Sequence, residues 1–131
     1  MQSIQIGTIG NLIDGTIVEG GGTDEVAVLN PATEEMLGSF ADSTSHDVDR
    51  AVSSARRAFP GWAALSPGAR ADVIRQLANL VEAHLDELAT LEVLDAGKPW
   101  SASRNGELPG ILESLRHFGA ISRVGLAQAA G

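Results

Sequence analysis

The sequence predicts an α/β chain in which short strands come first and helices follow. Residues 11–41 contain β-branched and other apolar runs interrupted by glycine and proline, a pattern typical of strands and turns. Residues 44–124 instead repeat apolar side chains every three or four positions, which is the period of amphipathic helices. We therefore expect a β-hairpin and strand region at 11–41 and a helical region at 44–124.

Two apolar runs, Asn11–Val18 and Glu25–Leu29, flank three consecutive glycines. This arrangement predicts a β-hairpin that turns at Gly20–Gly22. The motif Asn30–Thr33 should end the second strand, because its proline has no amide hydrogen to donate to a sheet. A third strand is predicted at Met36–Ala41.

Thr44 and Asp47 mark the start of a first helix. A capping hydroxyl followed three positions later by an acidic residue is typical of a helix N-terminus. Apolar residues follow at helical spacing: Val48, Val52, Ala55, Ala58 and Phe59. Pro60-Gly61 is expected to end this helix, which should cover about residues 46–59.

A second, longer helix should begin at Ser66-Pro67, where a hydroxyl can cap the helix and proline is tolerated in the first turn. Its predicted apolar stripe consists of Val73, Ile74, Leu77, Val81, Leu85, Leu88 and Leu91. Gly97 is placed as the left-handed residue that ends the helix, and Pro99 prevents continuation. A third helix is predicted from about Pro109 by Ile111, Leu112, Leu115, Phe118 and Ile121.

Composition excludes several classes of function. The 131 residues carry a formal net charge of -8 and no cluster of basic residues, which argues against nucleic-acid binding. No apolar run is long enough to cross a bilayer, and Met1–Gly10 has no basic leader pattern, so we expect no membrane contact and a cytoplasmic location. The absence of cysteine excludes disulfides, thiolate metal sites and a cysteine nucleophile in this chain.

No residue can be assigned a catalytic or cofactor-binding role from local patterns. The three histidines, His46, His84 and His117, are not spaced as zinc ligands and are interpreted as helix-surface residues. Neither a Gly-x-Gly-x-x-Gly motif nor a phosphate-binding Gly-Lys-Ser/Thr motif is present, and Gly20–Gly22 precedes a strand rather than a helix. The serines have no adjacent base that would activate a nucleophile.

The end of the long helix is electrostatically unusual. Glu92 and Asp95 lie where the helix dipole is negative, so a cation should compensate them. One interpretation is that Asp95 pairs with Lys98 or with a backbone amide. The other is that Asp95 and backbone carbonyls bind a hard monovalent cation, which prefers oxygen ligands.

Five ordered motifs together resemble the N-terminal quarter of the aldehyde dehydrogenase superfamily. They are Leu12–Gly15, Asn30–Thr33, Asp47–Val52, Ala58-Phe59 with Trp62, and Leu94–Pro99. The resemblance covers residues 12 to about 131. Glu107–Pro109 and Leu115–Ala120 are most similar to the aminobutyraldehyde and betaine aldehyde dehydrogenase branch. Glu34 departs from the family, in which glycine is common after the Asn-Pro-Ala-Thr turn.

The resemblance implies that residues 1–131 are a partial N-terminal segment of an NAD-dependent aldehyde dehydrogenase. The segment would form an incomplete α/β unit, namely the hairpin and helices that lead into the Rossmann-type cofactor domain. The catalytic cysteine, the general-base glutamate and the nucleotide-binding loop would all lie outside it, so the segment should neither bind NAD nor act on an aldehyde alone. Its partners would be the remainder of the parent enzyme or other copies in an oligomer. A family cation site for potassium or sodium would use the Asp95 carboxylate and the Val28 carbonyl.

An alternative function belongs to a different class. The chain could be a stand-alone helical module that binds a partner protein, such as a full-length relative, through its apolar helix faces. The predicted stripe between Val73 and Leu91 would then be the contact surface.

Overall fold

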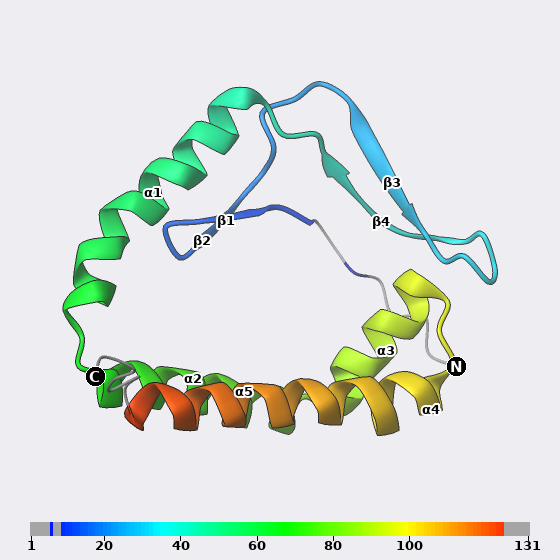
Figure 1. The fold of residues 1–131 in the computed structure, drawn as a ribbon. Helices are drawn as coiled ribbons and strands as arrows, with labels where there is room; N and C mark the ends of the chain where they lie inside the picture. The colour runs from blue at the N-terminus through cyan, green and yellow to red at the C-terminus, as the bar shows by residue number, and fades with distance from the viewer. Residues whose placement is uncertain (1–5, 7–8, 125–131) are drawn as a thin grey trace, which may run out of the picture. The chain divides into compact units, whose positions relative to one another are not determined.

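The computed structural model describes residue 6 and residues 9–124, and it confirms an α/β fold with four short strands followed by helices (Figure 1). The chain forms two compact units. Unit 1 contains the chain up to Pro60 together with Leu94–Gly97, and unit 2 contains Gly61–Val93 together with the chain from Lys98 onward. The four strands belong to unit 1.

The first hairpin lies earlier in the chain than the sequence predicts. Strands β1 (Asn11–Ile13) and β2 (Thr16–Val18) pair antiparallel around Asp14-Gly15. Both turn residues have positive φ, 54° and 76°, as a tight two-residue hairpin turn requires. The prediction that β2 would pair with the strand after Gly20–Gly22 was wrong, although the Asp-Gly signal was present in the sequence.

The glycine run has a packing role instead of a turn role. A Cβ added at Gly20 would lie 2.3 Å from the Ala41 carbonyl oxygen, and one at Gly22 would lie 2.5 Å from the Asp42 carbonyl oxygen. The Gly22 amide donates a 2.8 Å hydrogen bond to that same Asp42 oxygen. Glycine is therefore required because this segment approaches the backbone of a neighbouring strand closely.

The second hairpin joins β3 (Glu25–Leu29) to β4 (Met36–Ala41), which confirms the end of β3 before Pro31 and the strand predicted after it. In the connecting turn, the Asn30 side-chain oxygen accepts a 2.9 Å hydrogen bond from the Ala32 amide. Glu34 has a φ of 61°, in the left-handed region. This conformation explains why glycine suits that position better than glutamate.

Helix α1 (Ser45–Ala64) begins at the predicted cap but does not end at Pro60. The Thr44 amide donates to the Asp47 carboxylate at 2.9 Å, and the Asp47 amide donates to the Thr44 hydroxyl at 3.3 Å. An internal proline removes one hydrogen bond, which a long helix can tolerate. The helix ends before Ser66, which Pro67 restricts to an extended conformation with ψ 155°.

The predicted second helix is in fact two helices, α2 (Pro67–Ala83) and α3 (Leu85–Ala96). The Ser66 hydroxyl caps α2 as expected by accepting a 3.2 Å hydrogen bond from the Ala69 amide. His84, with φ -114° and ψ 20°, interrupts the helix. Its ring lies 2.9 Å from the Glu87 carboxylate, in the first turn of α3, so a local polar contact favours a new helix start.

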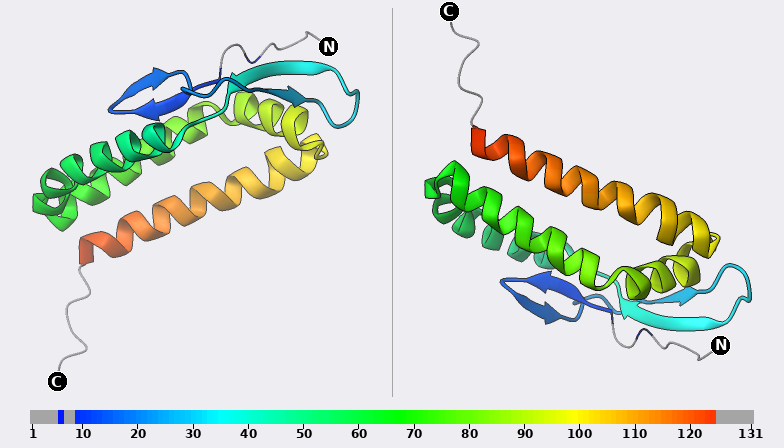
Figure 2. Two further views of the ribbon diagram at one scale, coloured as in Figure 1. Left: turned by 90° about the horizontal axis from the view of Figure 1, so that it is seen from above. Right: turned by 90° about the horizontal axis from the view of Figure 1, so that it is seen from below.

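The third helix begins nine residues earlier than predicted. A short helix, α4 (Trp100–Ala102), runs through a π-helical turn, η1 (Ser103–Glu107), into α5 (Leu108–Val124) without a break (Figure 1). Helices α2 and α5 lie side by side and antiparallel (Figure 2). Together with α3 they supply the core of unit 2, which consists of Ala71, Ala78, Ala89, Leu108 and Leu112.

The predicted apolar stripe of the long helix is not the buried face of α2. Val73 and Leu77 remain 44% and 46% exposed, whereas Ala71 and Ala78 are buried. The two helices approach closely at Gly119, where an added Cβ would lie 3.3 Å from Cγ2 of Ile74. Of the stripe, Ile74 meets α5 at Gly119, whereas the buried positions of α2 are the small residues Ala71 and Ala78.

Candidate functional site

The candidate site begins in the segment from Leu91 to Pro99, where the backbone is constrained at Gly97. Gly97 has a φ of 68° and follows the last residue of α3, which confirms its predicted role as the left-handed terminating residue. A Cβ at Gly97 would also lie 2.9 Å from Cγ of Pro31. Both the conformation and the space therefore require glycine here.

Lys98, which directly follows, compensates Glu92 rather than Asp95. Its ammonium group donates to Oε1 of Glu92 at 2.7 Å and to Oε2 of Glu107 at 2.7 Å. Among the residues that the structure describes, Asp95 takes part in no ion pair, and its side chain is exposed. The interpretation in which Asp95 pairs with Lys98 is therefore wrong.

Ser103 completes this polar network from the first position of η1. Its side chain is fully buried, and its hydroxyl donates to Oε2 of Glu92 at 2.6 Å. Sequence reasoning missed Ser103 and Glu107, because they meet Glu92 and Lys98 only after the chain reverses direction between α3 and α4. We name the four residues Glu92, Lys98, Ser103 and Glu107 the Lys98 network.

The Lys98 network is suited to holding structure and not to transferring protons. The hydrogen bond from Lys98, followed by that from Ser103, lowers the pKa of Glu92. The hydrogen bonds to Glu107 and Glu92 raise the pKa of Lys98. Each group is therefore driven further into its charged form, away from the poised protonation state that a general acid or base needs near neutral pH.

Both residues proposed as cation ligands lie in unit 1. Val28 lies on β3, opposite Gly38 of β4, and its side chain is half-buried. Asp95 lies in the last turn of α3. Within the described part of the chain, His, Asp and Glu side chains do not gather in a group of three that could hold a metal ion. The cation site at Val28 and Asp95 stays a prediction.

The histidines occupy separate environments. His84 contacts Glu87, His117 packs edge-on against Phe118 with ring centroids 5.4 Å apart, and His46 lines a groove beside α1. That groove, of about 550 Å³, contains both Asp and Arg side chains. Arg57 lies 4.0 Å from Asp14, and Arg50 lies 3.6 Å from Asp47 at the N-terminus of α1. Because the arginines have acidic neighbours, the groove does not present a dedicated anion site.

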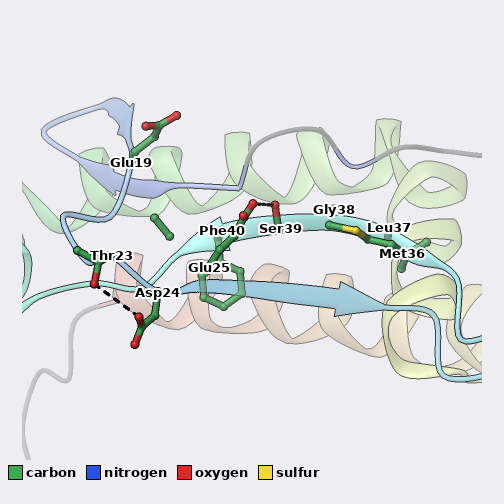
Figure 3. Close-up of a pocket in the computed structure, with 10 residues that line it drawn as sticks. Glu19, Thr23, Asp24, Glu25, Met36, Leu37, Gly38, Ser39 and Phe40 are labelled. Carbon is green, nitrogen blue, oxygen red and sulfur yellow. Dashed lines mark hydrogen bonds between the residues drawn. The ribbon is translucent and has the colours of Figure 1, made fainter.

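A larger groove of about 690 Å³ follows β4 and the start of β3 (Figure 3). Its ionisable lining residues are Glu19, Asp24 and Glu25, and the hydroxyl of Ser39 donates to the Glu25 carboxylate. Without a basic side chain in its lining, this groove is unsuited to the phosphates of a dinucleotide.

The two flanks of the α2–α5 pair differ sharply. On one flank Arg116 contacts Glu82 at 2.6 Å and Arg123 contacts Asp72. The other flank has an open groove of about 380 Å³ in which Trp62, Ile74, Leu115 and Phe118 supply the large apolar side chains. Phe118 is 66% exposed. The exposed side chains Val73, Leu77 and Leu80 on α2 lie toward the same side by helical spacing. We name this surface the apolar flank.

Comparison with known proteins assigns the family. The profile of the aldehyde dehydrogenase family matches residues 17–128. The chain belongs to the aldehyde dehydrogenase family. It is 40% identical over 108 residues to the putative aldehyde dehydrogenase DhaS of Bacillus subtilis, covering 81% of this chain and 22% of DhaS. It is 42% identical over 106 residues to the aminoacetaldehyde dehydrogenase of Pseudomonas aeruginosa, covering 79% of this chain and 21% of that enzyme.

The fold comparison agrees with the sequence comparison. The structure of the Bacillus cereus aldehyde dehydrogenase in complex with NAD⁺ matches with a TM-score of 0.83 and 34% identity, covering 89% of this chain and 24% of that enzyme. This confirms that the chain has the fold of the N-terminal region of the family. The chain thus spans between a fifth and a quarter of the length of these relatives. None of the described helices has the length and apolar character needed to cross a membrane.

Proposed function

We propose that the chain is the N-terminal segment of an NAD-dependent aldehyde dehydrogenase, and that the whole enzyme oxidises an aldehyde to a carboxylic acid. The similarity to the aminoacetaldehyde dehydrogenase of Pseudomonas aeruginosa favours an aminoaldehyde substrate. The residues of this segment support the fold of the enzyme. The nucleophile, the general base and the dinucleotide-binding loop are supplied by sequence outside the 131 residues.

The observation that carries this proposal is the apolar flank. Large side chains such as Leu77 and Phe118 are about half or more exposed, although they lie beside a close-packed helix pair. Exposed apolar surface of this kind marks a surface that another polypeptide covers. The remainder of the parent enzyme, or another subunit of an oligomer, supplies that cover.

The same proposal includes the monovalent-cation site. The Val28 carbonyl and the Asp95 carboxylate provide oxygen ligands of the kind that hard cations prefer. The exposed Asp95 carboxylate leaves its oxygens accessible for this role. In the whole enzyme, Asp95→Asn should abolish stabilisation by potassium or sodium chloride relative to an equal concentration of tetramethylammonium chloride. Unchanged stabilisation in the variant would exclude Asp95 as a ligand.

A chimera tests the main proposal. The matching segment of the Pseudomonas aeruginosa aminoacetaldehyde dehydrogenase is replaced by this chain, and NADH formation with aminoacetaldehyde is measured. We expect an active chimera, whereas the isolated 131 residues should produce no NADH. Leu77→Asp with Phe118→Asp should inactivate the chimera by placing charge on the apolar flank, and Arg116→Gln on the ion-paired flank is the matched control. A folded but inactive chimera would contradict the proposal.

A second candidate function uses the same flank differently. As a stand-alone module, the isolated chain would bind a full-length relative through Leu77 and Phe118. Light scattering and binding of an apolar dye to the isolated chain discriminate between the two functions. A monodisperse monomer that excludes dye supports the module, whereas dye binding and self-association that Phe118→Asp suppresses support the segment of a larger enzyme.

A further inference from the structure

The π-helical turn η1 interrupts an otherwise regular pattern of burial. Along the continuous helix that begins at Trp100, the buried side-chain positions after Ser103 are Leu108, Leu112 and Gly119, with Leu115 half-buried between the last two. The spacings are therefore five, four, three and four residues. Only the first differs from the three- or four-residue spacing of one face of an α-helix, and it coincides with η1.

The backbone of η1 accommodates this longer step. The Leu108 amide donates to the Ser103 carbonyl, five residues earlier, where an α-helix would bond four residues earlier. The turn thus contains one residue more than an α-helical turn needs. In a regular α-helix without this wider turn, α5 would be rotated by roughly 100° relative to Ser103.

The location of the wider turn has a local cause. Pro109 is the second residue of α5, and a proline ring inside a helix clashes with the carbonyl four residues earlier, here that of Asn105. We attribute the site of the π turn to Pro109, because a wider turn gives the Asn105 carbonyl room. This explains where the surplus residue is held but not what prevents the turn from relaxing.

The Lys98 network holds both ends of η1. Ser103, its first residue, is bound to Glu92 of α3, and Glu107, its last residue, is bound to Lys98. Lys98 also binds Glu92, so the two ends of the turn are tied through one pair of charged side chains. Hydrogen bonds to ionised groups are stronger than those between neutral groups, so the Lys98 network is suited to holding the two ends of η1.

We propose that η1 stores one surplus residue of the helix and that the Lys98 network locks it there, giving α5 two rotational settings. In the locked setting, Leu112 and Gly119 face α2, and Leu115 and Phe118 line the apolar flank. In the unlocked setting, the turn becomes α-helical, and α5 rotates by one residue. The Lys98 network therefore determines which face of α5 the apolar flank presents, whichever partner covers that flank.

Two deletions test whether a surplus residue exists. Both are made in the full chain with Pro109→Ala, so that the proline ring does not obstruct an α-helical turn. Deleting Asn105 removes the surplus residue and should preserve the contact between Gly119 and Ile74, observed as a nuclear Overhauser effect to the Ile74 methyl group. Deleting Glu113, an exposed residue between Leu112 and Gly119, should abolish that contact. Loss of the contact in both variants would overturn the proposal, whereas retention in both would show that η1 gives up its surplus residue to compensate for the second deletion.

Hydrogen exchange in the chain without deletions tests whether the Lys98 network holds η1 in its π-helical form. Lys98→Gln should accelerate exchange of the Leu108 amide by about fivefold, which is near the upper limit of the effect expected from the loss of a partly exposed ion pair. Glu113→Gln, on the exposed face of α5, is the control and should leave that rate unchanged. Equal exchange at Leu108 in Lys98→Gln and the parent chain would show that the network does not hold the turn.

Discussion

The two compact units are stabilised by different chemistry. In unit 1, the buried positions among the described residues include three polar side chains, Asn30, Asp47 and Ser54, beside the apolar Ile13 and Leu37. In unit 2, the buried positions among the described residues are the apolar Ala71, Ala78, Ala89, Leu108 and Leu112, together with Gly119 and the polar Ser103. Unit 1 therefore depends on specific hydrogen bonds, whereas unit 2 depends on close packing of small and branched side chains.

This difference follows from the local structure of each unit. Short hairpins bury little apolar area, so caps and turns must satisfy backbone groups through side chains such as Asp47, which accepts hydrogen bonds from both Gly21 and Thr44. In unit 2, the paired helices satisfy their own backbone groups and bury apolar side chains against one another, whereas the buried residues of α1 in unit 1 are the polar Asp47 and Ser54. Perturbations of packing should consequently affect unit 2 most, and perturbations of hydrogen bonding should affect unit 1 most.

The largest effect is expected from Leu112→Ala. Leu112 is 5% exposed and lies in the core of unit 2, so its truncation should lower the free energy of unfolding by about 2–5 kcal/mol. The adjacent Ile111 is 48% exposed, and Ile111→Ala should cost less than about 1 kcal/mol. Urea unfolding followed by circular dichroism measures both variants. Equal losses would show that unit 2 does not depend on the packing described.

Thr44→Ala is the corresponding test of unit 1. Thr44 caps α1 through its hydroxyl, which also donates to the Asp47 carboxylate at 2.7 Å. Loss of such a cap should destabilise the protein by about 1 kcal/mol. Thr23→Ala, at an exposed loop position, serves as the control. A thermal midpoint of Thr44→Ala equal to that of the control would contradict the importance of this cap.

Sequence patterns predicted the features that depend on neighbouring residues. The Thr44–Asp47 cap, the Ser66-Pro67 helix start and the Gly97 helix end all follow from contacts within a few positions. Each of these motifs forms its own hydrogen bonds or fixes its own backbone angle, so no distant partner is needed to select it.

Features that depend on distant partners were predicted poorly. The choice of Ala71 and Ala78 as the buried face of α2 depends on the approach of Gly119, about forty residues later. The contact of Ser103 with Glu92 likewise depends on the direction that the chain takes after Gly97, which the helix-end motif alone does not determine. The family motifs identified the family because they preserve order and spacing, which is information that periodicity alone does not carry.

Acid should weaken unit 1 through Asp47. The backbone hydrogen bond from Thr44, followed by that from Gly21, lowers the pKa of Asp47 from 3.8 to about 2. Because the folded-state pKa is the lower one, this stabilisation is complete above the unfolded-state value and is lost as pH falls from 3.8 toward 2. The Gly21 amide resonance, followed by NMR, should shift across this range. In Asp47→Asn the shift should be absent, and a persistent shift would assign the acid response to another group.

The smallest effect expected is a gain of stability in the β3–β4 turn. Glu34 has a φ of 61°, a conformation that is unfavourable for a residue with a Cβ and readily adopted by glycine. Relief of this strain in Glu34→Gly should raise the free energy of unfolding by roughly 0.5–1 kcal/mol. The net gain should be smaller, because glycine also increases the conformational entropy of the unfolded chain. The neighbouring Glu35→Gly is the matched control and should destabilise, because the Glu35 carboxylate accepts a hydrogen bond from Thr33. If both variants lose stability equally, the left-handed conformation of Glu34 is not a source of strain, and the hydrogen bonds of this turn alone determine its stability.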